Sequence, residues 1–345
     1  MIKKNPAFQI TYHTFEQKER IEFLIQKLQN DSSSISCQTS GSTGKPKLIY
    51  FDKNSLKISA QNSIDYFNLQ ENQVAVLCIS VDFVAGIMML VRAMIAGMKL
   101  HVTPVKKNTF KYVRFKADFI ALFPKQLDFF LNDRQGVKTL MKINSILVGG
   151  APISSKTESQ LISNGITIYQ SYGMTETLTH VAIKKTGFMG NKVYQSLPGI
   201  SFTESNGCLE IDYPALLNEK LITNDIVELI DSSSFKWLGR ADFIINSGGY
   251  KISPEQLEQK ISAILDCEFM VTAVKDTEFG QKTGLIFKGS APNYINKKMF
   301  SQIMHPYEIP KLYTVLNDFY TTENGKLDRK MTTLKSKKSV WKKIL

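Results

Sequence analysis

The chain has 345 residues, 43% of them hydrophobic, so it is long enough for about two domains with buried cores. Its 43 Lys and Arg residues outnumber its 31 Asp and Glu residues, and the formal net charge of +12 favours anionic ligands. Nucleic acid fits poorly, because no basic run alternates with regularly spaced aromatic residues and no zinc-finger spacing occurs. Nucleotides and other small polyanions explain the charge equally well.

The cysteines and the apolar segments indicate the cellular compartment of the protein. Cys37, Cys78, Cys208 and Cys267 are far apart and form no C-x-x-C pair, which indicates reduced thiols rather than a disulfide framework or a metal site. The first residues lack the apolar core of a signal peptide. Residues 74–98 are apolar enough to suggest a membrane helix, but charged residues interrupt them, and residues 74–81 fit a buried strand leading into a helix. We therefore expect a cytoplasmic protein without a membrane span.

The first predicted element is an amphipathic helix over residues 17–28, where Ile21, Leu24, Ile25 and Leu28 recur at helical spacing. After a polar break at residues 31–34, a segment rich in hydroxyls, glycine and lysine follows. It reads Thr39, Ser40, Gly41, Ser42, Thr43, Gly44, Lys45, Pro46, Lys47.

Such a segment suits a polyphosphate. Glycines allow backbone N–H groups to converge on an anion, hydroxyls donate hydrogen bonds, and lysines add positive charge. It is not a Walker loop, because Pro46 stands where that motif has Ser or Thr. A Ser/Gly-rich surface linker has the same composition, and the segment alone does not separate the two interpretations.

A helix is predicted over residues 52–69, then a strand over residues 74–79 and a second helix that turns its methionines into the core. Phe83 and Gly86 lie where the strand leads into this helix. Arg92 lies within the apolar helix, where its guanidinium could pair with a substrate carboxylate or with an acid of the protein.

Further strands are predicted over residues 101–104, 119–123, 146–148 and 166–169, with helices between them. This alternation predicts a parallel sheet with ligands at the carboxyl ends of its strands. Two strands end in distinctive turns, which read Gly149, Gly150, Ala151, Pro152 and Gln170, Ser171, Tyr172, Gly173, Met174, Thr175, Glu176, Thr177. An aromatic face suits a purine, and a carboxylate beside phosphate oxygens suits Mg²⁺. Taken singly, the first segment is also compatible with a plain strand-to-helix turn, and the second with a helix cap.

The rest of the chain predicts smaller elements. Residues 197–199 form a turn into a β-rich portion with a strand at 209–211, and Asp225 ends a polar turn. Residues 237–255 continue with Arg240, Asp242 and the pair Gly248 and Gly249, after which a Pro-Glu pair begins a helix. The remainder predicts a compact α+β domain, and the basic tail 335–345 predicts a solvated helix.

Taken together and in this order, these segments resemble the motifs of the adenylate-forming superfamily of acyl- and aryl-CoA synthetases, luciferases and peptide-synthetase adenylation domains. The resemblance runs from about residue 37 to 329 and includes a last match at residues 322–329. It implies a large N-terminal α/β domain with a mostly parallel sheet, residues 1–239, and a small, mobile C-terminal α+β domain, residues 240–345. Members usually carry a substantial subdomain ahead of the phosphate loop, and we therefore expect the N-terminal domain to be shortened here.

The resemblance also implies roles for single residues. Lys326, Thr175 and Glu176 would be catalytic, with Glu176 holding Mg²⁺, Asp242 would be the hinge, and Phe83, Gly86 and Arg92 would line the acyl pocket. Gly248, Gly249 and Lys251 would line the coenzyme A channel. ATP or AMP would contact Thr39, Ser40, Gly41, Ser42, Thr43, Gly44, Lys47, Gly150, Ala151, Pro152, Ser171, Tyr172, Gly173, Asp225 and Arg240. Two positions depart from the family pattern, since Phe83 replaces the usual His and Asn224 the usual Gly.

The implied activity is that of an acid–CoA ligase that forms an acyl-adenylate and then a thioester. Its partners would be a small carboxylic acid, ATP with Mg²⁺, and coenzyme A. Within the superfamily, the compact size, residues 90–93 and the context of residues 149–152 are most similar to o-succinylbenzoate–CoA ligases of menaquinone synthesis. Another aryl- or acyl-CoA synthetase, an enzyme that loads a carrier protein, and a non-catalytic nucleotide-binding protein stay open. The oligomeric state stays open too, a homodimer included.

Lys326→Ala is predicted to abolish adenylate formation, because the change removes a cation that offsets the charge on the reacting phosphates. Thioester formation from synthetic acyl-adenylate should stay largely intact. Pyrophosphate exchange measures the first half-reaction, and thioester release from the synthetic adenylate measures the second. An equal loss in both would contradict the role given to Lys326.

Overall fold

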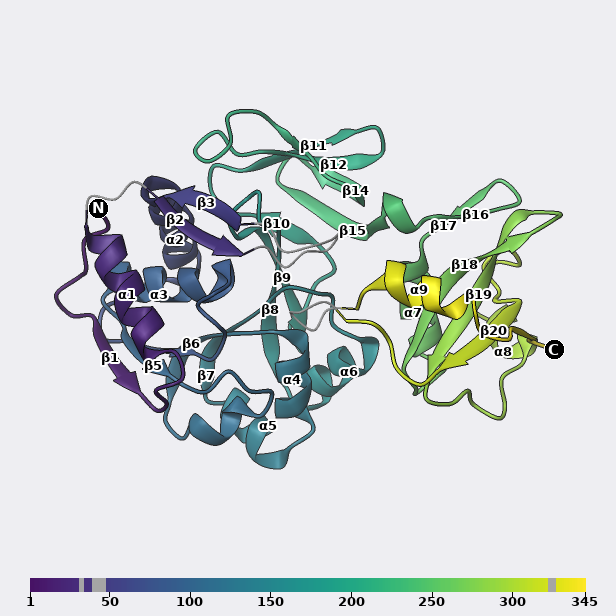
Figure 1. The fold of residues 1–345 in the computed structure, drawn as a ribbon, viewed down its shortest axis with the longest axis horizontal. Coiled ribbons are helices and arrows are strands. Elements are labelled where there is room, and N and C mark those ends of the chain that lie inside the picture. The colour runs from purple at the N-terminus through teal and green to yellow at the C-terminus, as the bar shows by residue number, and fades with distance from the viewer. Residues whose placement is uncertain (31–33, 39–47, 322–326) are drawn as a thin grey trace.

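The computed structural model describes residues 1–30, 34–38, 48–321 and 327–345, which form a large and a small lobe (Figure 1). The large lobe is built on a ten-stranded sheet of the described residues. Its strands, in spatial order, are β1 (Gln9–Tyr12), β5 (Lys99–Val102), β4 (Val74–Leu77), β6 (Ala117–Leu122), β7 (Ile143–Val148), β8 (Thr167–Gly173), β9 (His180–Gly187), β10 (Tyr194–Ser196), β15 (Ser234–Arg240) and β14 (Asp225–Asp231).

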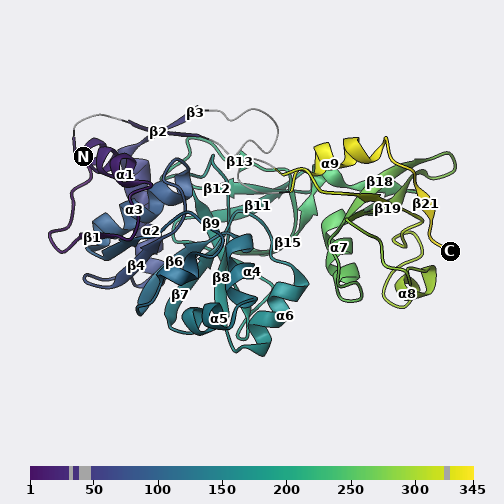
Figure 2. The same ribbon diagram turned by 60° about the horizontal axis from the view of Figure 1, so that its bottom comes forward.

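The half of this sheet from β1 to β8 is parallel, and the half from β8 to β14 is antiparallel. The parallel half is covered by helices on both faces, as parallel sheets require (Figure 1 and Figure 2). Along β4, Ala75 and Leu77 pack into one core, whereas Val76 packs into the other. The predicted α/β fold with a parallel sheet is confirmed.

Six α-helices and one 3₁₀ helix of the described residues supply the two covering layers. The first core contains α1 (Lys18–Gln29), α2 (Lys53–Phe67) and α3 (Val84–Ala96), and the second contains η1 (Thr109–Tyr112), α4 (Pro124–Leu131), α5 (Arg134–Leu140) and α6 (Ser155–Ser163). Helix α3 is buried on nearly all sides, which explains the apolar stretch that resembles a membrane helix. No helix among the described residues is long and apolar enough to cross a membrane.

Two smaller sheets border the large one. One is the antiparallel pair β2 (Ser34–Gln38) and β3 (Leu48–Asp52). The other consists of β11 (Ser201–Ser205), β12 (Cys208–Asp212) and β13 (Leu221–Ile222), and it confirms the strand predicted at residues 209–211. Phe202, Leu209 and Ile211 pack in a third core together with Phe235 of β15.

The small lobe has a separate hydrophobic core around Leu257, Leu285 and Phe300. Its elements are η2 (Ala241–Phe243), β16 (Ile245–Ser247), β17 (Tyr250–Ile252), α7 (Pro254–Ser262), β18 (Phe269–Asp276), β19 (Gly280–Lys288), α8 (Lys297–Ser301), β20 (Leu312–Leu316), α9 (Arg329–Ser336) and β21 (Lys342–Lys343).

The prediction of a helical tail over residues 335–345 is wrong. Helix α9 ends at Ser336, and β21 pairs with β20. Ile344 is buried in the small-lobe core, and Trp341 packs beside Met270 and Ile286. Burial of these apolar side chains outweighs the helical preference that the lysine-rich composition suggests.

The four cysteines all lie in the described part of the chain and are free. Burial raises the pKa of Cys37 to about 11 and that of Cys78 to about 12. Burial also raises the pKa of Cys208 and of Cys267.

Gly86→Ala is predicted to destabilise the large lobe by about 1–3 kcal/mol or more, because the added methyl group overpacks the core. A Cβ atom at position 86 would lie 2.1 Å from the carbonyl oxygen of Ser80. Chemical denaturation measures the effect. The matched control is Gly165→Ala, where the new Cβ meets nothing within 4 Å and only the positive φ of 66° opposes the change. Equal losses in the two variants would contradict the prediction.

Candidate active site

A cavity of about 170 Å³ lies at the carboxyl ends of the parallel strands, beside the start of α3. Among the predicted site residues, its walls contain Phe83, Arg92, Gly150, Ser171, Gly173 and Thr175. Residues from the two turns after β7 and β8 therefore share one cavity with residues of α3. A larger hollow of about 500 Å³ beside η1 and α5 contains none of the predicted site residues.

Arg92 is the most unusual residue in the cavity wall. Its side chain is buried, with 3% exposed, and it forms no ion pair with any described residue. Its Nη1 approaches the Sδ of Met89 at 3.1 Å, its guanidinium lies 5.7 Å from the ring centre of Phe119, and its Nε has no hydrogen-bond partner in the described chain. Burial lowers the pKa of Arg92 to about 10. A buried cation without an acid beside it indicates a site for an anion.

His180, at the start of β9, lines the same cavity and was missed by the sequence reasoning. Its Nε2 lies 3.0 Å from the Oγ of Ser63 on α2. Burial, and then the charge of Arg92, lower the pKa of His180 to about 3, so the imidazole is neutral at physiological pH. The sequence does not reveal that His180 lines a cavity. A single His before the apolar residues 181–183 forms no motif, and its neighbours Ser63 and Arg92 lie far away along the chain.

Asp225 is the centre of a second polar group. The hydroxyl of Tyr172 donates to its Oδ2 at 2.7 Å, and the indole Nε1 of Trp237 donates to its Oδ1 at 3.0 Å. Nη1 of Arg240 lies 3.9 Å from Oδ1. Burial and the Asp225 charge raise the pKa of the Tyr172 hydroxyl, which stays protonated. The contribution of Trp237 was not predicted, although it lies in a segment that the sequence singles out.

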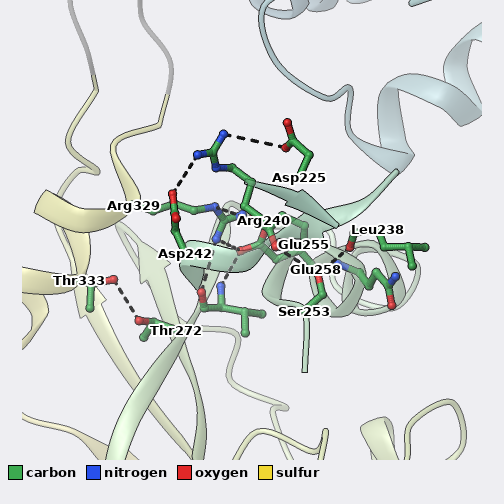
Figure 3. A network of polar contacts seen from close by, with 12 residues as sticks. Asp225, Leu238, Arg240, Asp242, Ser253, Glu255, Glu258, Thr272, Arg329 and Thr333 are labelled. Carbon is green, nitrogen blue, oxygen red and sulfur yellow. Dashed lines mark hydrogen bonds and ion pairs between the residues drawn. The ribbon is translucent and has the colours of Figure 1, made fainter. Parts of the chain in front are cut away.

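A network of charged and uncharged polar contacts lies at the boundary between the lobes (Figure 3). Nη2 of Arg240 lies 2.8 Å from Oδ2 of Asp242, and the hydroxyl of Ser253 donates to the carbonyl of Leu238 at 2.8 Å. Arg329, at the start of α9, forms a two-point ion pair with Glu258 of α7, and its Nε lies 3.7 Å from Glu255. The start of α9 is thereby fixed to α7, which follows the boundary directly in the chain.

The other predicted site residues lie in different parts of the molecule. Gly86 packs against the Ser80 carbonyl rather than lining the cavity. Ala151 and Pro152 precede α6, and Gly248 and Gly249 form the β16–β17 turn with φ of 58° and 84°. Lys251 is exposed on β17. The phosphate-loop residues Thr39, Ser40, Gly41, Ser42, Thr43, Gly44 and Lys47, together with Lys326, lie outside the described residues.

Comparison with known proteins identifies the family. The family model described as AMP-binding enzyme matches residues 4–203, more than half of the chain. The chain belongs to the AMP-binding enzyme family. A 2-succinylbenzoate–CoA ligase of Bacillus cereus (strain Q1) is 24% identical over 350 residues, which cover 89% of the chain and 71% of that relative.

Solved structures of AMP-binding enzymes have the same fold. An acyl-CoA synthetase (AMP-forming)/AMP-acid ligase II-like protein from Dyadobacter fermentans is 32% identical, with 93% of the chain and 95% of that protein covered and a TM-score of 0.63. O-succinylbenzoate coenzyme A synthetase from Bacillus subtilis, in complex with ATP and magnesium, is 19% identical, with 94% and 78% covered and a TM-score of 0.74. The predicted class, an adenylate-forming acid–CoA ligase, is confirmed.

The described residues fit the nucleotide that an AMP-binding enzyme uses. A carboxylate offers about four acceptor positions. Tyr172 and Trp237 occupy one on each oxygen of Asp225, and positions are left for the hydroxyls of a ribose. Gly150, Ser171 and Thr175 lie in the adjoining cavity wall, where glycine and hydroxyl groups suit a phosphate ester.

Glu176 fits the metal ion. Its side chain is exposed and has no hydrogen bond or ion pair with any other residue that the structure describes. The described chain contains no group of three or more His, Cys, Asp or Glu residues able to hold a metal. Mg²⁺ typically takes one or two carboxylates and fills its shell with phosphate oxygens and water. A single free carboxylate beside the nucleotide site is therefore sufficient.

Arg329→Met is predicted to destabilise the protein by about 3 kcal/mol, because Glu258 would keep its partly buried charge without a counterion. The side chains of Arg329 and Glu258 are 15% and 21% exposed. Chemical denaturation measures the loss. Lys236→Met is the matched control, because its pair with Glu228 is 39% and 51% exposed, and such surface pairs contribute at most about 1 kcal/mol. A control loss as large as that of Arg329→Met would refute the argument.

Proposed function

We propose that this acid–CoA ligase activates o-succinylbenzoate and that Arg92 binds the carboxylate that is not activated. The buried, unpaired guanidinium of Arg92 is the observation that carries the proposal. A substrate with one carboxylate would leave this charge uncompensated, whereas the second carboxylate of a diacid supplies the missing partner.

The remaining cavity wall suits an aromatic ring. Ile79, Phe83, Leu147 and Leu178 contribute apolar surface. An apolar cavity of about 150 Å³ is enough for a benzene ring, and this cavity has about 170 Å³. The names of the Bacillus relatives, which are o-succinylbenzoate ligases, support the same acid.

In the proposed first half-reaction, the succinyl carboxylate attacks the α-phosphate of ATP and pyrophosphate leaves. Thr175 and residues 39–47 donate hydrogen bonds to phosphate oxygens, Asp225 holds the ribose, and Tyr172 packs on the adenine. Lys326 adds positive charge at the reacting phosphate, where such charge stabilises the transition state. Mg²⁺ on Glu176 would offset the charge of the phosphates.

In the proposed second half-reaction, residues 240–345 turn as one unit about Asp242. The motion removes Lys326 and brings Gly248 and Gly249 to the channel along which the coenzyme A thiolate reaches the acyl carbon. The separate core of the small lobe supports movement as a unit, and the Arg240–Asp242 contact lies at its boundary. Closure of the site also excludes water from the reactive anhydride.

A panel of carboxylic acids in ATP–pyrophosphate exchange tests the proposal. We expect o-succinylbenzoate to support exchange well and 4-oxo-4-phenylbutanoate, which lacks the ring carboxylate, to support it poorly. Arg92→Met should lower kcat/KM for o-succinylbenzoate roughly 10- to 150-fold, as expected for the loss of a charged hydrogen bond of about 1.5–3 kcal/mol, and should remove most of the preference between the two acids. Preference for a monocarboxylate in the unaltered enzyme would overturn the proposal.

A further inference from the structure

We propose that His180 is a second specificity-determining residue, whose Nδ1–H donates a hydrogen bond to the substrate carboxylate held by Arg92 in the tautomer in which the Ser63 hydroxyl donates to Nε2. The inference rests on the proposed function, because it concerns the same diacid. It adds a residue and a change of hydrogen-bond direction at Ser63 that the binding of an anion by Arg92 alone does not require.

The hydrogen bonds around Ser63 define the starting tautomer. The Ser63 hydroxyl has one hydrogen and donates it to the carbonyl oxygen of Ser59 at 3.2 Å. The same hydroxyl oxygen lies 3.0 Å from Nε2 of His180, and both contacts are hydrogen bonds at once only when Nε2 carries the ring hydrogen and donates it to Ser63. Nδ1 is then a bare acceptor in a ring that lines the cavity, and it has no hydrogen-bond partner among the described residues.

A bare Nδ1 is unsuited to an incoming carboxylate. Both groups would present lone pairs to each other, and a neutral imidazole donates from only one of its two nitrogens. The ring also does not gain a charge readily, because burial and the nearby Arg92 strongly favour its neutral form. A carboxylate paired with Arg92 therefore gains a donor from His180 only if the ring hydrogen moves from Nε2 to Nδ1.

Ser63 makes this exchange feasible. If its O–H rotates from the Ser59 carbonyl towards Nε2, the hydroxyl becomes the donor and Nε2 becomes the acceptor in the contact of 3.0 Å. Nε2 gives its proton to solvent water and Nδ1 takes one from solvent water, so the imidazole stays neutral and the net proton uptake is zero. The substrate carboxylate then has two donors, Arg92 of α3 and His180 of β9, which lie in different walls of one cavity.

Steady-state exchange kinetics test the selectivity. His180→Phe keeps a ring but has neither donor nor acceptor, and we expect it to raise KM for o-succinylbenzoate relative to that for 4-oxo-4-phenylbutanoate by about tenfold or more. His180→Gln should retain most of the selectivity, because its amide donates without a tautomer change. Ser63→Ala should lose part of it. His101→Gln is the matched control, since His101 pairs with His13 outside the cavity.

Nitrogen-15 NMR of the histidine side chains in the full-length enzyme gives a second readout that does not need turnover. The His180 signal, identified by its absence in His180→Gln, should change from the Nε2–H to the Nδ1–H form when o-succinylbenzoate is added. An unchanged tautomer, or an equal rise in KM for both acids in His180→Phe, would overturn the inference while leaving the proposed function standing. If the unaltered enzyme activates neither acid, the proposed function fails and the inference fails with it.

Discussion

The parallel half of the large sheet must be shielded from water on both faces, and this requirement arranges the rest of the large lobe. Helices on the two sides bury residues that alternate along each strand, such as Ala75 and Val76 of β4. The polar turns are consequently displaced to the strand ends, where the turns after β7 and β8 meet the start of α3. A cavity with a glycine and hydroxyl wall beside an apolar wall results from the way the sheet is covered.

Burial of the Arg92 charge in that apolar wall costs electrostatic free energy, and a bound anion would offset that cost. The same uncompensated charge helps to keep His180 neutral, so the two residues differ in kind: one is a fixed cation, and the other is an adaptable neutral ring. Asp225, which we propose to hold the nucleotide, differs from Arg92 because it already has two hydrogen-bond donors. In the function that we propose, the nucleotide therefore meets hydrogen bonds that are already formed, whereas the acid completes the site at Arg92.

The sequence predicted features that depend on local chemistry. Periodicity predicted α1, the Pro-Glu pair at residues 254–255 predicted the start of α7, and Gly248 with Gly249 predicted a tight turn. It did not predict features that depend on distant partners. Ser63 and His180 are 117 positions apart, and the pair formed by Glu258 and Arg329 spans 71 positions. The tail was predicted wrongly for the same reason, because the burial of Trp341 and Ile344 depends on residues of other strands.

The protonation of the cysteines has a practical consequence. A thiol reacts with disulfide reagents through its thiolate, and all four side chains have pKa values above that of an ordinary cysteine. At neutral pH the protein therefore contributes little to the colour that such reagents develop. The free coenzyme A that remains in timed samples can be measured against a low background, which gives a direct assay of thioester formation without a coupling enzyme.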